Sequence, residues 1–353
     1  MARNSPRLDW AENGKSLSIF SMDSQLNLIL KGTSRAFYLS LAALPAAARE
    51  PLSLGYLLAR AADTVADAPA PESVDRTGAL LSLREALTQG EGAGWQAPNE
   101  LVPEVEKERE LLRSVPQLLA LLKSRSPEER RAIQDVVSTL IEGMLWDQAK
   151  FSQGASPGQQ GLSREDLETY TYLVAGCVGP FWSWVCATSD PRLQVLLSPG
   201  VHEMSIEFGK GLQWVNILRD APKDQSNGRN YLAALGTEDS RLTFPGQAAR
   251  ALFALATASR YPTLFPRTAL GHRLAVFWPL AIGFRTLEKL FSDGGPRLDH
   301  RVKVARWEVL VWVFLGPLFV LSNWGLEKVL SGLRDRAESA LKSLEERYEK
   351  TSF

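Results

Sequence analysis

The sequence predicts an all-α protein that folds as a single domain of about ten helices. Apolar residues recur mostly at the three- and four-residue spacing of helices, and the alternation that marks strands is scarce. The segments rich in Gly, Pro, Ser and Asn are too short to be domain linkers. A chain of 353 residues is long enough to bury a large core. We therefore assign residues 1–353 to one helical domain.

In the N-terminal half, a predicted helix lies between a polar start and two breaks. Residues 1–20 lack the apolar stretch of a signal peptide, and we expect a flexible segment there. A helix is predicted over residues 56–67, and a Pro- and Asp-containing break at 68–75 ends it. The next break, at 89–103, contains a Gly-Ala-Gly-Trp-Gln-Ala string. Because that string follows helical residues rather than a strand, it does not predict a dinucleotide-binding loop.

The clearest single helix runs over residues 127–145. Its apolar residues follow the i, i+3, i+4, i+7 spacing from Ile133 onward, and the Ser126-Pro127 pair followed by two glutamates is typical of a helix start. After a break at 152–163, Ser163 begins another helix with a variant of the capping box.

The C-terminal third is strongly apolar. Its most apolar run, residues 309–321, has 13 residues, which is fewer than the roughly 20 that cross a bilayer. This run predicts a buried core helix; the alternatives are the wall of an apolar cavity or a patch that touches a bilayer surface. The last residues, 325–353, are predicted to form a charged helix.

Composition excludes several classes of protein. The 40 basic and 40 acidic residues give zero formal net charge, which argues against nucleic-acid binding. The two cysteines, Cys177 and Cys186, lie in an apolar stretch, which excludes a disulfide framework and favours a reducing compartment. The three histidines are isolated and lack the spacing of a zinc site. We expect a cytoplasmic protein without a transmembrane helix.

Two predicted helices each carry a pair of aspartates four residues apart. In both, the aspartates belong to a polar stripe on one face of an otherwise apolar helix. The first stripe comprises Tyr56, Arg60, Asp63 and Asp67, and the second comprises Gln213, Asn216, Asp220 and Asp224. Pro222 cannot donate a helical hydrogen bond, so we expect the second helix to end or kink there.

These stripes predict a binding site for a metal ion and a phosphate group. Buried carboxylates of like charge are costly unless cations lie between them. Carboxylate oxygens are ligands that Mg²⁺ prefers, together with the phosphates of a substrate. Arg60, Arg219 and Arg229 lie nearby in the sequence, and guanidinium groups bind phosphate oxygens in pairs. Either aspartate pair alone would instead be typical of a solvated helix face.

Together with three further blocks, the stripes resemble the squalene/phytoene synthase family, the branch of the isoprenoid synthases that couples prenyl groups head to head. The Asp63-Thr64 start of the first motif is more similar to squalene synthases than to phytoene synthases. The five matching blocks are residues 34–38, 56–67, 170–176, 212–220 and 224–231.

The resemblance implies an isoprenoid-synthase-type helical bundle around a central apolar cavity. It also implies squalene synthase activity, in which two farnesyl diphosphates condense with Mg²⁺ to presqualene diphosphate and a hydride from NADPH then gives squalene. We expect a bacterial enzyme without the C-terminal anchor of eukaryotic squalene synthases. Peripheral contact with the inner face of the membrane is expected, because the substrate tails and the product are apolar.

The family's site positions carry over to this sequence residue by residue. The metal-binding positions are Asp63, Asp67, Asn216, Asp220 and Asp224. The diphosphate-binding positions are Ser34, Arg35, Tyr56, Arg60, Gln213, Asn216, Arg219 and Arg229. Tyr170 matches the tyrosine of the cyclopropane-forming step. Rings that would line the tunnel and stabilise the cation, if they are not ordinary core residues, are Phe37, Phe181, Trp184 and Trp214.

Two positions depart from the family pattern. Ala66 and Lys223 stand where the family usually has a further acid, which would weaken a metal site or be neutral, and Lys223 could instead reach a phosphate. The sequence has no dinucleotide fingerprint, but squalene synthases of the family use NADPH without one. Because residues 301–306 resemble their late basic segment, Lys303 and Arg306 are predicted to bind this cofactor; the alternative is a solvated helix start.

Two other functions stay open. The same fold could form dehydrosqualene, hydroxysqualene or, with a longer tunnel, phytoene without NADPH. A non-catalytic scaffold relative is the second alternative, but such relatives tend to lose the aspartates, and all four are present here.

Overall fold

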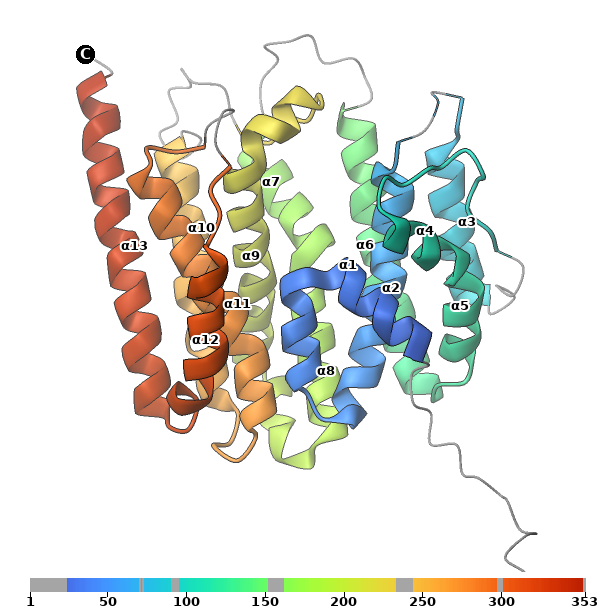
Figure 1. Ribbon diagram of the computed structural model, residues 1–353, viewed down its shortest axis with the longest axis horizontal. Coiled ribbons are helices and arrows are strands. Elements are labelled where there is room, and N and C mark those ends of the chain that lie inside the picture. Colours follow the sequence, from blue (N-terminus) through green and yellow to red (C-terminus); the bar gives the residue numbers. More distant parts are fainter. Residues whose placement is uncertain are drawn as a thin grey trace, which may run out of the picture.

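The computed structural model is a bundle of α-helices (Figure 1). It describes residues 24–69, 71, 73–89, 95–151, 162–232, 244–296 and 301–351. Within these ranges every regular element is a helix, which confirms the predicted fold class. The N-terminal segment 1–20, expected to be flexible, and residues 92–94 of the 92–97 string lie outside the described residues.

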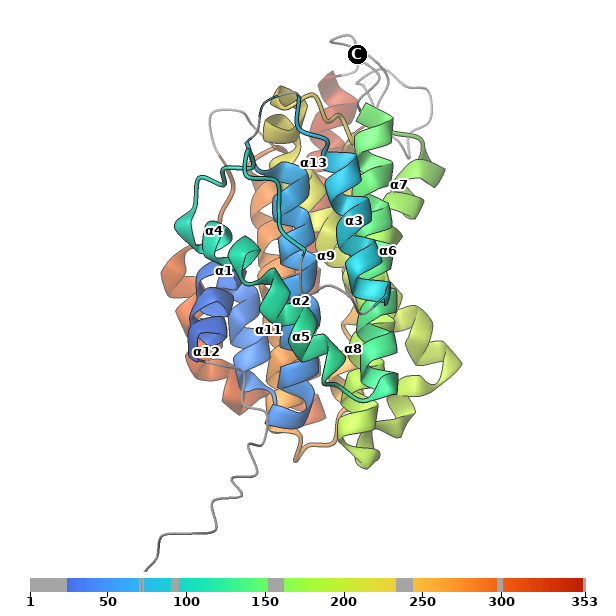
Figure 2. The ribbon, with the colours of Figure 1, turned by 90° about the vertical axis from the view of Figure 1, so that its right-hand side faces the viewer.

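The helices follow one another along the chain, many of them upright in the bundle (Figures 1 and 2). The α-helices are α1 (Ser24–Ala43), α2 (Ala46–Asp67), α3 (Arg76–Gln89), α4 (Glu106–Arg113), α5 (Val115–Lys123), α6 (Pro127–Phe151), α7 (Arg164–Thr171), α8 (Val178–Ser189), α9 (Pro199–Ser226), α10 (Phe244–Ala258), α11 (Leu270–Ser292), α12 (Arg306–Phe319) and α13 (Asn323–Thr351). Three short elements are the π-helix η2 (Tyr172–Gly176) and the 3₁₀-helices η3 (Pro191–Leu197) and η4 (Tyr261–Leu264).

The predicted helix starts and the predicted proline effect are both visible. The Ser126 hydroxyl accepts a hydrogen bond from the Glu129 amide at 3.2 Å, and the Ser163 hydroxyl accepts one from the Asp166 amide at 3.1 Å, as helix caps do. α9 continues past Pro222 to Ser226, so the helix does not end at the proline. Its last turns bend away from the main axis in Figure 1, which is the kink expected where proline removes a helical hydrogen bond.

The backbones of α8 and of η2 pack closely against the backbone of α9. A Cβ atom at Gly179 would lie 1.9 Å from the Ser205 carbonyl oxygen, and one at Gly209 would lie 2.2 Å from the Ala175 carbonyl oxygen. Only glycine allows this approach of two backbones. The buried side chains form two hydrophobic clusters, one centred on α2, α5, α6 and α8 and the other on α9, α10, α11 and α13.

The apolar run at 309–321 does not form a buried core helix. It makes up most of α12, whose inner face packs on α11 while many large apolar side chains of its outer face are exposed. The prediction of a buried helix was wrong because α12 lies at the edge of the bundle, where its neighbours α11 and α13 leave its outer face uncovered. Among the described residues, we find no helix whose length and hydrophobicity would suffice to cross a membrane.

Candidate active site

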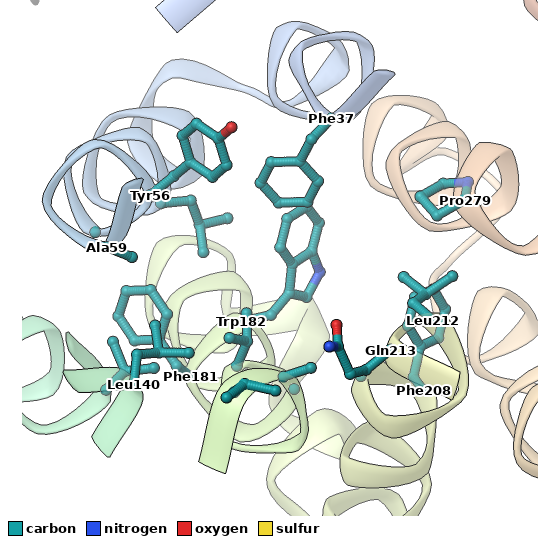
Figure 3. A pocket seen from close by; sticks show the side chains of 18 of the residues that line it. Phe37, Tyr56, Ala59, Leu140, Phe181, Trp182, Phe208, Leu212, Gln213 and Pro279 are labelled. Atoms are coloured by element: carbon teal, nitrogen blue, oxygen red, sulfur yellow. The ribbon is translucent and has the colours of Figure 1, made fainter. Parts of the chain in front are cut away.

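An apolar cavity of about 420 Å³ lies among α1, α2, α6, α8, α9 and α11. Its walls are mostly aromatic and aliphatic, as Figure 3 shows for Phe37, Phe181 and Trp182. The ionisable and amide side chains that line it lie toward the C-terminal ends of two helices, α2 and α9, which run in the same direction (Figure 1). These lining residues are Arg60, Asp63, Gln213 and Asn216. The cavity therefore has one polar end and a long apolar remainder.

The first polar stripe lies on α2 at this end of the cavity. Arg60 forms an ion pair with Asp63 and a second one, at 2.5 Å, with Glu108 at the start of α4. Burial raises the pKa of Asp63 to about 6, and the neighbouring Asp67 and Glu108 add to the effect while Arg60 opposes it. Tyr56 donates a hydrogen bond to the Thr33 carbonyl at 3.2 Å, which joins the stripe to α1.

The second stripe lies on α9, and its two aspartates have different environments. Although burial acts to raise it, hydrogen bonds from Arg219 and Arg301 hold the pKa of Asp220 below its usual value. The Arg301 guanidinium reaches both carboxylate oxygens, at 2.7 and 2.8 Å. Burial raises the pKa of Asp224 to about 6, with Asp220 adding to the effect. Gln213 and Asn216 lie about two turns and one turn before Asp220, respectively, on the same face.

Arg229 brings the two stripes together. It follows a turn at Gly228, whose φ of +80° is one that glycine adopts readily, and its amide donates to the Asp224 carbonyl at 2.8 Å. Its guanidinium then binds Asp67 at 2.9 Å and Asp147 of α6, also at 2.9 Å. One arginine after α9 thus contacts the last acid of the first stripe, beside the last acid of the second.

Tyr170 lies next to this group in a buried chain of hydrogen bonds. Its hydroxyl donates to the Tyr231 hydroxyl at 3.1 Å, and Tyr231 in turn donates to Asp147 at 2.6 Å. The Tyr170 ring stacks between Tyr231 and Trp146, with centroids 4.9 and 5.9 Å away. The π-helix η2 begins two residues later, and such helices often occur at functional sites.

Two of the four predicted tunnel rings lie at the cavity wall. Phe37 and Phe181 line the cavity, but Trp184 and Trp214 do not. Successive residues of a helix are separated by about 100°, so Trp214 is on the side of α9 opposite Gln213 and Asn216, where it packs in the core. Trp184 likewise does not face the cavity, although Phe181 on the same helix, α8, does. Trp182, which the sequence analysis missed, lines the cavity instead.

The remaining predicted residues lie beside the site or have side chains that the structure does not describe. The side chains of Ser34 and Arg35, both on α1, are not among the described residues. Lys303 and Arg306 are exposed, in a segment held beside α9 through Arg301 and Asp220. At the two departures from the family pattern, Ala66 is buried and Lys223 is exposed.

The acids fit a site for Mg²⁺ by their chemistry rather than by a preformed cluster. In the described part of the chain, no three His, Cys, Asp or Glu side chains are grouped closely enough to hold a metal ion. Asp63, Asp67 and Asp220 pair with arginines instead. Their hard oxygen atoms suit Mg²⁺, and burial beside another carboxylate is what a divalent cation would relieve at Asp63 and Asp224.

Besides Trp182, four residues of the site were not predicted from the sequence: Glu108, Asp147, Tyr231 and Arg301. Asp147 had a signal that could have been used, because it is seven residues after Leu140, on the apolar face of its helix. A lone acid on a buried face requires a partner. Tyr231 ends the matching block 224–231 and Arg301 begins the basic segment 301–306, but neither was assigned a role, and Glu108 had no comparable local signal.

The chain is similar in sequence to squalene and phytoene synthases. Residues 30–308 match the sequence profile of the squalene/phytoene synthase family. A squalene synthase of Schizosaccharomyces pombe is 30% identical over 208 residues, covering 58% of this chain and 42% of the relative. A bifunctional lycopene cyclase/phytoene synthase of Blakeslea trispora is 26% identical over 205 residues, covering 58% of this chain and 31% of the relative.

A solved structure shares the fold. The complex of TcSQS with the ligand E5700 superposes with a TM-score of 0.68 at 18% identity, covering 91% of this chain and 97% of that one. The matched segments span less than half the length of the two sequence relatives. Since the family profile covers most of the sequence, the chain belongs to the squalene/phytoene synthase family.

Proposed function

We propose that the chain is a squalene synthase. It couples two farnesyl diphosphates head to head with Mg²⁺, through presqualene diphosphate, and the product becomes squalene with a hydride from NADPH. The observation that supports this most is that both polar stripes reach one end of an apolar cavity. Asp63, Gln213 and Asn216 line that end, and Arg229 contacts Asp67 and acts on Asp224 beside it. Diphosphate fits the charged end, and a prenyl tail fits the apolar walls.

The charged end is suited to assist loss of diphosphate. When bound, Mg²⁺ would neutralise charge on the leaving diphosphate, held by Asp63, Asp67, Asn216, Asp220 and Asp224. Arg60, Arg219 and Arg229 are already placed there by their carboxylate partners. Each guanidinium has five donors, so it can bind a phosphate oxygen while one of its carboxylate contacts is kept.

Tyr170 and the aromatic walls of the cavity would act on the hydrocarbon part of the prenyl substrate. Burial raises the pKa of Tyr170 above its usual value, so its phenol keeps its proton near neutral pH. It can therefore offer a neutral hydroxyl or its ring to a cation without losing a proton to water. Phe37 and Phe181 present aromatic surface to the same cavity, where they would keep water away and stabilise positive charge.

The proposed activity is tested with the purified full chain, farnesyl diphosphate, Mg²⁺ and NADPH, with products identified by gas chromatography and mass spectrometry. We expect squalene when all components are present, no squalene without NADPH, and no diphosphate release after chelation of Mg²⁺ with EDTA. Lys303 and Arg306 keep their predicted role only if product depends on NADPH. Absence of both squalene and presqualene diphosphate would overturn the proposal.

A second candidate is a phytoene synthase, which the similarity to the Blakeslea trispora relative favours. The two candidates differ in tail length and in reductant, because phytoene is formed without NADPH from a longer prenyl diphosphate. Offering farnesyl and geranylgeranyl diphosphates in parallel separates them. A main product from the longer substrate that does not change when NADPH is omitted would establish the second candidate over the first.

Replacing Tyr231 by phenylalanine is expected to slow cyclopropane formation about tenfold while leaving the fold intact. The change keeps the ring that stacks on Tyr170 but removes the hydroxyl that accepts the Tyr170 hydrogen bond. A net hydrogen bond is worth about 1 kcal/mol, close to the 1.4 kcal/mol of a tenfold change in rate. Single-turnover formation of presqualene diphosphate measures it, with Tyr38→Phe as the control. An unchanged rate would show that this hydroxyl does not position Tyr170.

A further inference from the structure

The outer face of α12 carries an unusual concentration of exposed apolar side chains. The helix lies on the outside of the bundle in both views (Figures 1 and 2). Phe314 is 73% exposed, Trp307 66% and Leu318 62%, and Trp324, at the start of α13, is 73% exposed. The other large apolar side chains exposed on this face are Leu310, Val311, Leu315 and Leu321. We call these eight residues the α12 apolar face.

The inner side of α12 is fixed firmly to its neighbour, so the apolar face is held in place. At its N-terminal end, the buried Glu308 binds Arg285 at 2.9 Å and Lys289 at 2.7 Å, both on α11. In its middle, the Trp278 indole donates to the Trp312 carbonyl at 2.9 Å. Past its C-terminal end, Asn323 accepts a hydrogen bond from the buried Arg273. These polar contacts would be lost if the helix turned its apolar side inward.

Two exposed cations lie directly before the α12 apolar face, and residues 309–326 carry no charge. Residues 309–326 contain no Asp, Glu, Lys, Arg or His. Lys303 and Arg306, both exposed, come directly before the apolar face. Trp307 and Trp324 stand near its two ends, and tryptophan is the residue most typical of the border between lipid and water. Apolar face, terminal tryptophans and flanking cations together match a helix that lies in a membrane interface.

We propose that the α12 apolar face docks on an anionic lipid bilayer, with Lys303 and Arg306 against the lipid headgroups. A second copy of the chain is a poorer occupant for reasons of charge. An identical face would bring the same exposed Lys303 and Arg306 and no acid within residues 309–326, whereas anionic headgroups supply the opposite charge. A bilayer requires no matching surface, because interfacial binding grows with whatever apolar area is inserted.

The test measures binding of the purified full chain to vesicles without substrate or NADPH, so it is independent of the proposed activity. Vesicles of phosphatidylcholine alone are compared with vesicles that also contain phosphatidylglycerol, by co-sedimentation. We expect the chain to bind the anionic vesicles more tightly, and the double substitution Phe314→Ser with Leu318→Ser to weaken this binding at least about tenfold. Phe253→Ser is the matched control, because Phe253 is 63% exposed on a different helix, α10.

A second measurement reports insertion directly. Lipids brominated on their acyl chains should quench tryptophan fluorescence of the bound chain, and Trp307→Phe and Trp324→Phe should each reduce that quenching. The substituted side chains are exposed, so thermal unfolding of every variant should match the unaltered chain. Equal vesicle binding by the double variant and the unaltered chain would overturn the proposal. So would a stable dimer in sedimentation equilibrium that the double variant dissociates, because the face would then be an interface between copies.

Discussion

Asp63→Asn is expected to slow release of diphosphate from farnesyl diphosphate by about 10²–10³-fold, the loss typical when one group that stabilises developing charge is removed. Asp63 lies at the polar end of the cavity and has been assigned to metal binding. Asparagine keeps the shape of the side chain and one oxygen but removes the charge that attracts a divalent cation. The measurement is diphosphate release at saturating Mg²⁺.

The same substitution should leave stability unchanged or slightly improved. Burial raises the pKa of Asp63 to about 6, so near pH 7 its ionised form is less favourable in the folded chain than in the unfolded one. A neutral asparagine avoids that penalty, and Arg60 keeps Glu108 as its partner. Asp135→Asn, at a 74% exposed side chain on α6, is the control and should alter neither property. Near-normal diphosphate release by Asp63→Asn would remove Asp63 from the metal site.

The parts of the site that could be predicted from sequence are those in which position along one helix determines position in space. Arg60 and Asp63 pair because residues three apart share a helix face. The same rule, applied to Gln213 and Asn216, correctly places both on the cavity side of α9. Local periodicity therefore sufficed for the two stripes, and the family resemblance supplied the expectation that they meet.

Contacts between distant segments could not be predicted in this way. Arg301 reaches Asp220 across 81 residues, and Tyr231 reaches Asp147 across 84. No spacing rule connects such pairs, since the distance depends on how several helices pack. The tryptophans show a different limit: Trp214 could have been excluded by its position opposite Gln213, whereas choosing Trp182 over Trp184 requires the rotation of α8 in the bundle.

The apolar run in α12 shows why composition alone cannot separate a core from a surface. Residues 309–321 are as apolar as a buried helix, but α12 lies at the edge of the bundle with α11 on one side. Burial of an apolar residue depends on what covers it, and the sequence does not state that. The two alternatives to a core helix, a cavity wall and a patch that touches a bilayer surface, predict different surroundings for this run. Among the described residues that line the cavity at the candidate active site, none comes from 309–321, so this run does not form a wall of that cavity.

Asp147→Ala is expected to lower the free energy of unfolding by about 1–3 kcal/mol, because it leaves the Tyr231 hydroxyl without its acceptor and removes one of the two acid partners of Arg229. Asp147 is 5% exposed and accepts from the Tyr231 hydroxyl at 2.6 Å and from the Arg229 guanidinium at 2.9 Å. Alanine would leave Arg229 with Asp67 as its acid partner and would leave the Tyr231 hydroxyl without its acceptor. Burial of charge makes that loss larger than for an exposed pair.

Thermal unfolding provides the measurement for Asp147→Ala. At about 2.1 cal/mol/K of unfolding entropy per residue, a loss of about 1–3 kcal/mol lowers Tm by about 1–4 °C for a chain of 353 residues. The Tm of Asp147→Asn should lie between that of Asp147→Ala and that of the unaltered chain. The amide oxygen can still accept a hydrogen bond from Tyr231, but it carries no charge for Arg229. Asp135→Ala on the same helix, with its exposed side chain, should change Tm little. If Asp147→Ala unfolds at the same temperature as Asp135→Ala, then the Arg229 contact does not stabilise the fold, and Arg229 must be held at the site by Asp67 alone.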